Sequence, residues 1–198
     1  MRKQIVGKFA KEICMNDVER LLEVAKERKA LMFGEFQLSA GGTSSYYFDG
    51  RILTLDPEGS FLVAKCLFPI LVQNKVEAIA GPTLGADPIV STVSLYSYLQ
   101  NNPIKGLIVR KEAKAHGGRR SIEGAYEPGM KVAVVDDTCT SGSSLFHAID
   151  VVESLGCDVV KVLSVLDRKA GGSDELANRG YQFESLLTAD GSGNISTR

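Results

Sequence analysis

The sequence lacks the features of several protein classes. It has no apolar run of roughly 18 residues, and Lys3, Lys8 and Lys11 interrupt its beginning, so we expect neither a signal peptide nor a membrane helix. The formal net charge is only −1, which argues against a molecule that binds polyanions over its whole surface. No two of its four cysteines share a CxxC spacing, so neither a zinc site nor a disulfide framework is expected. Free thiols favour the reducing cytoplasm, and the length suits one globular domain.

Two common nucleotide-binding motifs, GxxxxGK[ST] and GxGxxG, are also missing, and another pattern stands in their place. Residues 132–144 read VAVVDDTCTSGSS, which predicts a buried parallel strand and a polar turn, and residues 145–152 predict a helix. Such a turn offers backbone N–H groups and the positive end of the helix dipole to an anion. A site for phosphate alone would not include the carboxylates of Asp136 and Asp137. They fit a ligand that also carries hydroxyls or a hydrated Mg²⁺, such as a phosphorylated sugar.

A second unusual stretch is the basic segment 110–124. It holds five Lys or Arg residues against two Glu, one of the two histidines of the chain, and three glycines. A solvated surface loop and a nucleic-acid contact are the plain alternatives, but no second basic patch supports the latter. We expect a mobile lid that closes over a polyphosphate, because cations neutralise its charge and closure excludes water.

The rest of the chain alternates strand and helix patterns, which predicts a doubly wound, mainly parallel α/β sheet flanked by helices. Three polar segments follow predicted strands: the turn 81–88, the loop after Asp136, and Asp167-Arg168. Because open α/β sheets place ligands at the carboxyl ends of their strands, we expect one active site there. Further expected elements are a helix over 11–32, a hairpin over 36–51, a helix over 56–73 with Asp56 as N-cap, and a disordered polar tail over 190–198.

These motifs resemble those of a known family. The strand followed by Asp-Asp and Thr-x-Thr-x-Gly-x-Ser resembles the signature of the type I phosphoribosyltransferases, which bind phosphoribosyl pyrophosphate (PRPP). Residues 109–117 (VRKEAKAHG), 38–49 and 166–168 are similar to segments of the orotate phosphoribosyltransferases, one branch of that family. The resemblance implies the type I phosphoribosyltransferase fold in a single domain, 1–198. Its parts would be an N-terminal hood (1–55), a PRPP-binding core (56–188) with the mobile loop 110–124, and a tail (189–198).

The resemblance also implies a reaction. Orotate and PRPP would give orotidine 5′-monophosphate and pyrophosphate in pyrimidine synthesis, by displacement at ribose C1 through a transition state with oxocarbenium character. Mg²⁺ would be the cofactor, held mainly through PRPP and water rather than by protein ligands. A homodimer is implied in which loop 110–124 completes the neighbouring active site, in the cytoplasm, without nucleic acid or membrane as partner.

The implied site residues fall into three groups. Lys114, Arg110, His116 and Asp137 would be catalytic. PRPP would be bound by Arg110, Lys111, Lys114 and His116 together with Asp136, Asp137, Thr138, Cys139, Thr140, Ser141, Gly142, Ser143 and Ser144. Orotate would be bound by Thr140, Tyr47, Phe48 and Arg168, whose guanidinium can clamp a carboxylate with two hydrogen bonds.

Two positions depart from the pattern. The family often has lysine where this chain has Ser39 and Gly85, so pyrophosphate would rely more on the loop cations and on backbone amides. Three other functions stay open at this point: a phosphoribosyltransferase for a purine or uracil, a non-catalytic PRPP sensor, and a nucleic-acid-binding protein. Arg168 argues against a neutral base, which would give the guanidinium no carboxylate partner.

Overall fold

A computed structural model describes residues 17–37, 43–112, 121–190 and 192–197 of the chain. Residues 17–27 are helical. The elements that follow are β1 (Leu31–Gln37), β2 (Thr43–Phe48), α2 (Gly50–Thr54), α3 (Pro57–Gln73), β3 (Ala78–Pro82), α4 (Asp87–Leu99), β4 (Lys105–Val109), β5 (Ile122–Glu123), β6 (Lys131–Cys139), α5 (Ser143–Ser154), β7 (Asp158–Asp167), α6 (Gly172–Asn178), β8 (Phe183–Ala189) and β9 (Ile195–Thr197).

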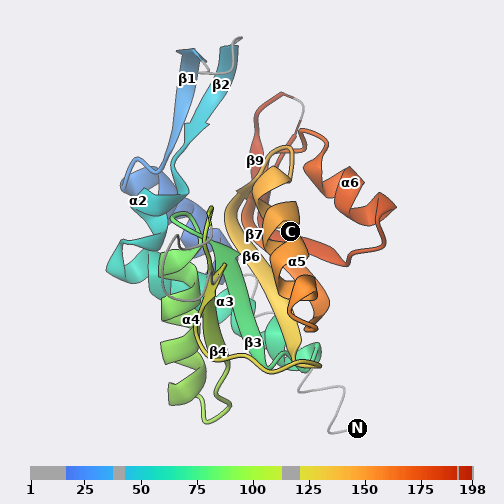
Figure 1. The fold of residues 1–198 in the computed structure, drawn as a ribbon. Coiled ribbons are helices and arrows are strands. Elements are labelled where there is room, and N and C mark those ends of the chain that lie inside the picture. Colours follow the sequence, from blue (N-terminus) through green and yellow to red (C-terminus); the bar gives the residue numbers. More distant parts are fainter. Residues whose placement is uncertain (1–16, 38–42, 113–120, 191, 198) are drawn as a thin grey trace, which may run out of the picture.

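The described strands form a seven-stranded sheet and a separate hairpin. The order in the sheet is β5-β4-β3-β6-β7-β8-β9, and the hairpin β1-β2 projects above it (Figure 1). The five central strands pair in parallel, and the edge strands β5 and β9 pair antiparallel to their neighbours. This mostly parallel sheet confirms the predicted α/β class.

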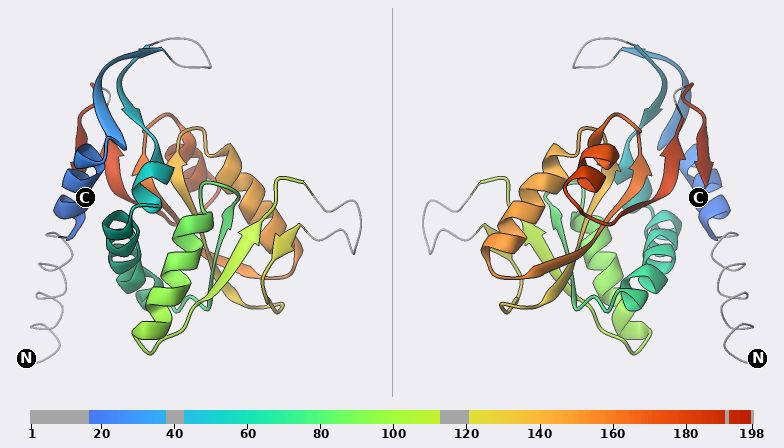
Figure 2. Two further views of the ribbon diagram at one scale, coloured as in Figure 1. Left: turned by 90° about the vertical axis from the view of Figure 1, so that its left-hand side faces the viewer. Right: turned by 90° about the vertical axis from the view of Figure 1, so that its right-hand side faces the viewer.

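Helices cover both faces of the sheet (Figure 2). Along β6, Ala133 and Val135 pack in the cluster that contains α3, α4 and residues 17–27, whereas Val132 and Val134 pack against α5. The run of small apolar residues is therefore buried on both sides, which is the situation of a central parallel strand. Its polar continuation emerges at the sheet edge where α5 begins.

The predicted start of α3 is confirmed. Asp56 accepts hydrogen bonds from the backbone N–H groups of Glu58 and Gly59, both at 3.0 Å, and Pro57 occupies the first turn. The hydrogen bond from Gly59 has the largest effect in lowering the pKa of Asp56, followed by that from the guanidinium of Arg28. An N-cap of this kind stabilises a helix by about 1 kcal/mol.

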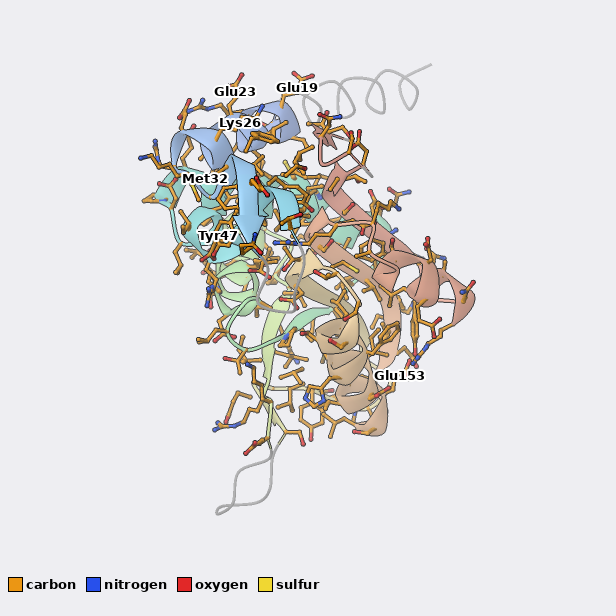
Figure 3. All side chains as sticks on the ribbon, turned by 90° about the horizontal axis from the view of Figure 1, so that it is seen from above. Glu19, Glu23, Lys26, Met32, Tyr47 and Glu153 are labelled. Atoms are coloured by element: carbon orange, nitrogen blue, oxygen red, sulfur yellow. The ribbon has the colours of Figure 1, made fainter. Side chains whose placement is uncertain are left out.

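The helix expected over 11–32 is shorter than predicted. Within the described residues it ends at position 27, and Lys29 adopts a positive φ of 57° before β1 begins. Apolar residues at helical spacing continue to Leu31, but Leu31 pairs with Phe48 of β2 and becomes part of the hairpin. Tertiary pairing here overrides the local pattern. Figure 3 shows Glu19, Glu23 and Lys26 on the outer side of the helix, opposite the buried core.

The disorder expected for the tail is wrong for its described part. Ile195–Thr197 forms β9 beside β8, and the carboxylate of Asp190 accepts hydrogen bonds from the backbone of Ser192 and Asn194, both at 2.9 Å. The hydroxyl of Ser45 in β2 donates to the carbonyl of Ser192 at 3.1 Å. The described residues of the tail, 190 and 192–197, thus form contacts with the hood and an edge strand beside β8.

Candidate active site

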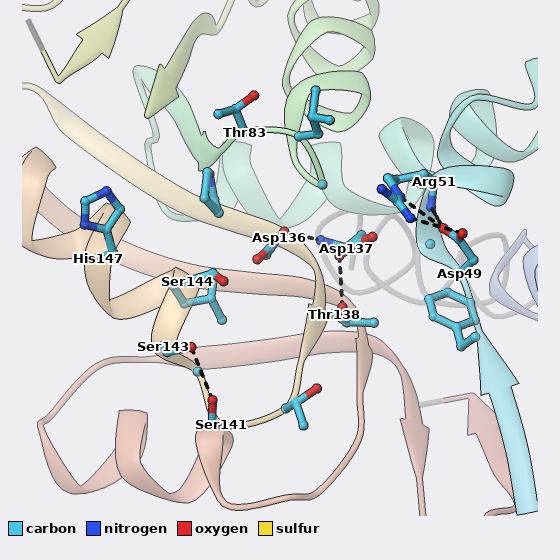
Figure 4. Close-up of a pocket in the computed structure, with 18 of the residues that line it drawn as sticks. Asp49, Arg51, Thr83, Asp136, Asp137, Thr138, Ser141, Ser143, Ser144 and His147 are labelled. Carbon is cyan, nitrogen blue, oxygen red and sulfur yellow. Dashed lines mark hydrogen bonds and ion pairs between the residues drawn. The ribbon is translucent and has the colours of Figure 1, made fainter. Parts of the chain in front are cut away.

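A cavity of about 740 Å³ opens at the carboxyl ends of β3 and β6, beneath the hood (Figure 4). Two of the three segments that the sequence placed at one site line it, namely the turn after β3 and the loop after Asp136. Figure 3, a view from above, shows Tyr47 of β2 at the hairpin and Glu153 near the C-terminal end of α5. The lining residues are 47–51, 82–85, 111, 136–138, 140–145 and 147.

The loop between β6 and α5 has the geometry of an anion site. Gly142 adopts a left-handed conformation (φ 78°), α5 begins at Ser143, and no side chain caps the helix. The first intrahelical bond runs from the N–H of Phe146 to the carbonyl of Gly142 at 2.8 Å, so the preceding N–H groups remain directed out of the helix. The loop supplies backbone N–H groups to the cavity, together with the hydroxyls of Ser141, Ser143 and Ser144.

A glycine of α6 supports this loop from behind. The N–H of Gly172 donates to the carbonyl of Thr140 at 2.9 Å. An added Cβ at Gly172 would lie 2.6 Å from both the Thr140 carbonyl oxygen and the Gly142 nitrogen. Only glycine allows this approach, and the anion loop is thereby held in one place.

The two carboxylates lie side by side at the cavity floor. Asp136 is buried, and its Oδ1 accepts from the N–H of Asp137 at 2.9 Å, while Asp137 accepts from the hydroxyl of Thr138 at 2.9 Å. Burial, and next the charge of Asp137, raise the pKa of Asp136 to about 7. Gly85 borders both groups, since a Cβ there would lie 2.7 Å from Asp136 Oδ1 and 3.0 Å from Asp137 Oδ1. Hydroxyl donors of a ligand would favour the ionised form of Asp136.

The residues expected to hold the base lie at the hood end. Thr140, Tyr47 and Phe48 line the cavity, and Arg168 lies behind them rather than in its wall. The Nη2 of Arg168 donates to the carbonyl of Phe48 at 3.0 Å, and its guanidinium lies 5.5 Å from the ring centre of Tyr46. Its Nε is buried and has no partner among the described residues. Arg168 must therefore turn toward the cavity to meet a ligand.

The basic segment is described only at its two ends. Lys111 lines the cavity, whereas Arg110 does not, because its guanidinium pairs with Glu123 of β5 at 2.8 Å. The backbone N–H of Arg110 donates to the carbonyl of Ser121 at 2.8 Å, which closes the base of the segment. Lys114 and His116 lie outside the described residues, as does Ser39, so their roles stay predictions.

Cys139 differs from the other residues of the loop. Its thiol is fully buried in the core under α5, and burial raises its pKa to about 12. A thiol in this state is neither a nucleophile nor a cavity residue.

Sequence reasoning missed two side chains in the cavity wall. Arg51, at the start of α2, pairs with Asp49, and His147, on α5, contacts the carbonyl of Arg110 through Nε2 at 2.9 Å. Because a carbonyl only accepts, Nε2 carries the hydrogen in this contact. His147 thus joins the base of the basic segment to the anion-loop helix. The one local signal was the position of Arg51 three residues after the end of the aromatic segment 46–48.

Among the described residues, no group of three or more His, Cys, Asp or Glu side chains could hold a metal ion. In the same part of the chain, every helix is too short or too polar to cross a membrane.

The chain is similar to known proteins over most of its length. It is 39% identical over 175 residues to an orotate phosphoribosyltransferase of Aquifex aeolicus, which covers 87% of this chain and 96% of the relative. The crystal structure of Mycobacterium tuberculosis H37Rv orotate phosphoribosyltransferase with Fe(III) dicitrate matches with a TM-score of 0.76 and 34% identity, covering 87% of this chain and 96% of that one. The same enzyme in complex with PRPP matches with a TM-score of 0.72 and 30% identity over the same shares of the two chains. No family model matches the chain.

Proposed function

We propose how this site works on the premise that the chain belongs to the orotate phosphoribosyltransferase family. The chain is an enzyme that transfers the 5-phosphoribosyl group from PRPP to orotate in pyrimidine biosynthesis. The observation that carries this function is the shared cavity. An uncapped helix N-terminus, two adjacent carboxylates and an aromatic hood face one space that can hold a phosphorylated sugar and a flat ring.

The parts of PRPP match different walls of the cavity. We place the 5-phosphate on the amides and hydroxyls of residues 140–144, where the helix dipole favours a dianion. The ribose hydroxyls would donate to Asp136 and Asp137. The diphosphate on C1 would then lie toward the turn 82–85 and Lys111, on the opposite side from the 5-phosphate.

Orotate would enter beneath the hood. Tyr47 and Phe48 would cover its ring, and Thr140 would contact a polar edge. The unpartnered Nε of Arg168 would turn to the carboxylate, since guanidinium–carboxylate pairs are the strongest hydrogen bonds of this type. Specificity for orotate over neutral bases would depend on this pair.

Catalysis would depend on charge stabilisation. As the bond between ribose C1 and the diphosphate breaks, positive charge grows on the sugar and negative charge on the leaving group, and orotate N1 forms the new bond. Lys111 and the predicted residues Lys114 and His116 would stabilise the leaving pyrophosphate. Arg110 would join them on leaving its ion pair with Glu123. No protein nucleophile is needed, in agreement with the buried thiol of Cys139.

Mg²⁺ fits this site as a companion of PRPP. Mg²⁺ usually keeps several waters and binds through one or two carboxylates plus substrate phosphates. Asp136 and Asp137 line the cavity beside the proposed diphosphate site and can supply that small share. When bound, the ion would neutralise charge on the diphosphate.

We also propose that the enzyme works as a homodimer in the cytoplasm. Large apolar side chains are exposed on α2, on the turn after β3 and on α4, which share one side of the molecule (Figure 2). Leu55 and Tyr98 are each 70% exposed, and a second copy of the chain would cover them. The buried thiols of Cys139 and Cys157, which form no disulfide, agree with a reducing compartment. The exposed residues of this surface are Ile52, Leu55, Leu84, Leu95, Tyr98 and Leu99.

The function is tested by following orotate absorbance with PRPP and Mg²⁺. We expect turnover of orotate and none of adenine, hypoxanthine or uracil. Arg168→Gln should raise KM for orotate about tenfold or more, with KM for PRPP nearly unchanged, because one charge-assisted pair is lost. Turnover of a neutral base instead of orotate would assign another phosphoribosyltransferase activity. PRPP binding without turnover of any base would identify a sensor.

A further inference from the structure

The cavity wall contains a guanidinium that the reaction as described above does not use. Among its described lining residues, Arg51 and Lys111 are the lysine and arginine side chains, against the carboxylates of Asp49, Asp136 and Asp137. This balance is unfavourable for PRPP, whose diphosphate and 5-phosphate both carry negative charge. Each cation that reaches the cavity therefore matters for binding.

Arg51 is fixed in place by its own helix. Asp49 caps α2 by accepting from the backbone N–H of Arg51 at 3.1 Å. The same carboxylate accepts from Nε and Nη2 of Arg51, both at 3.2 Å. This two-pronged pair occupies one edge of the planar guanidinium and leaves Nη1 without a partner among the described residues. The side chain is half exposed and presents this free edge at the cavity wall.

The start of α2 is also packed directly against the carboxylates. A Cβ on Gly50 would lie 2.6 Å from both Cβ and Oδ2 of Asp137, so only glycine permits this approach. Asp137 is close enough to raise the pKa of Arg51, although Asp49 has the larger effect. Figure 4 shows Arg51 and Asp49 beside Asp137, with His147 at the other side of the cavity. Arg51 therefore lies on the wall away from the 5-phosphate loop and near the turn that contains Gly85.

We propose that Arg51 binds the diphosphate of PRPP, and the pyrophosphate product, through the free edge of its guanidinium. Gly85 leaves that part of the wall without a side chain, because a Cβ there would meet both aspartates. Arg51 supplies from α2 the positive charge that position 85 does not. The inference rests on the proposed placement of PRPP and adds a binding residue to it.

Steady-state kinetics of the full-length enzyme test this role. For Arg51→Gln we expect KM for PRPP and the inhibition constant of added inorganic pyrophosphate to rise about tenfold, as for one lost charge-assisted contact. KM for orotate should stay unchanged. Arg51→Lys keeps the positive charge but loses the planar pair of N–H donors. Its KM for PRPP and its inhibition constant for pyrophosphate should therefore lie between those of Arg51→Gln and wild type.

Arg28→Gln is the matched control. Arg28 pairs at 2.9 Å with Asp56, the N-cap of α3, just as Arg51 pairs with the N-cap of α2, but it lies outside the cavity. This variant should leave all three constants unchanged. Equal pyrophosphate inhibition in Arg51→Gln and wild type would overturn the proposal, and so would a rise confined to KM for orotate. Either result would leave the function itself intact, because wild-type turnover of orotate tests that separately.

Discussion

Alanine at Lys114 is expected to lower kcat by about a hundredfold or more, as is common when a group that stabilises transition-state charge is removed. Lys111 already lines the cavity, and Lys114 follows it by three residues on the same segment. The ammonium would lose its interaction with pyrophosphate as the bond to ribose C1 breaks. KM for orotate should change little, because the base is held under the hood. Initial rates from orotate absorbance measure this change directly. Unchanged turnover would show that the segment takes no part in catalysis.

The same variant tests whether the segment serves the neighbouring subunit. Asp137→Asn should damage the loop side of the site, so each variant alone is nearly inactive. A mixed dimer contains one Lys114→Ala subunit and one Asp137→Asn subunit. If the segment acts across the dimer, one of its two active sites carries neither substitution and the other carries both. Random exchange of equal amounts should then restore about a quarter of wild-type activity, because half the dimers are mixed and each has one intact site of two. No recovery after exchange, with mixed dimers verified by mass, would place the segment in its own subunit's site.

The sequence predicted the anion loop well because its chemistry is contiguous. Strand, carboxylates, hydroxyls and helix N-terminus follow one another within 132–152, and local rules describe each of them. The structure places Asp136, Asp137, Thr138 and residues 140–144 around one cavity, as expected. Cys139 is the exception: its thiol lies in the core under α5, although regular alternation along β6 would place it on the face of Ala133 and Val135.

Arg51 and His147 could not be predicted because their roles depend on distant partners. Arg51 reaches the carboxylates only because Gly50 packs on Asp137, which is far away in sequence. His147 has the spacing of an ordinary helical residue, and its contact with Arg110 exists only once α5 lies beside the end of β4. The tail was misjudged for a related reason. Its polar composition suggests disorder, but the carboxylate of Asp190 accepts hydrogen bonds from the backbone N–H groups of Ser192 and Asn194. The edge of β8 then pairs with β9.

The affinity for PRPP should fall steeply below neutral pH because of Asp136. In the free enzyme, burial and the neighbouring charge of Asp137 raise the pKa of Asp136 to about 7. Ribose hydroxyls that donate to the carboxylate favour its ionised form, so the pKa in the complex must be lower. Binding therefore releases a proton below pH 7. The dissociation constant should rise about tenfold for each pH unit lost, until the pKa of the complex is reached.

Calorimetry in two buffers of different ionisation enthalpy measures this proton directly. Near pH 6 we expect wild type to release close to one more proton per PRPP than Asp136→Asn, whose side chain cannot ionise. The comparison removes the titration of PRPP's own phosphates, which is the same for both proteins. Equal proton release by the two proteins would show that Asp136 is already ionised before PRPP binds.

Stability of the free enzyme gives an independent check of the same group. A pKa raised on folding means that Asp136 stabilises the fold fully below its unfolded pKa of about 4, and that this contribution is lost as the pH rises through about 7. Asp136→Asn removes the cost of the buried charge. The variant should therefore gain in Tm over wild type at pH 8 by several degrees, as expected for 1 kcal/mol or more in a chain of this size, with little gain at pH 4. Weaker PRPP binding combined with higher stability would show that the enzyme holds a buried carboxyl group for binding at the expense of its own fold.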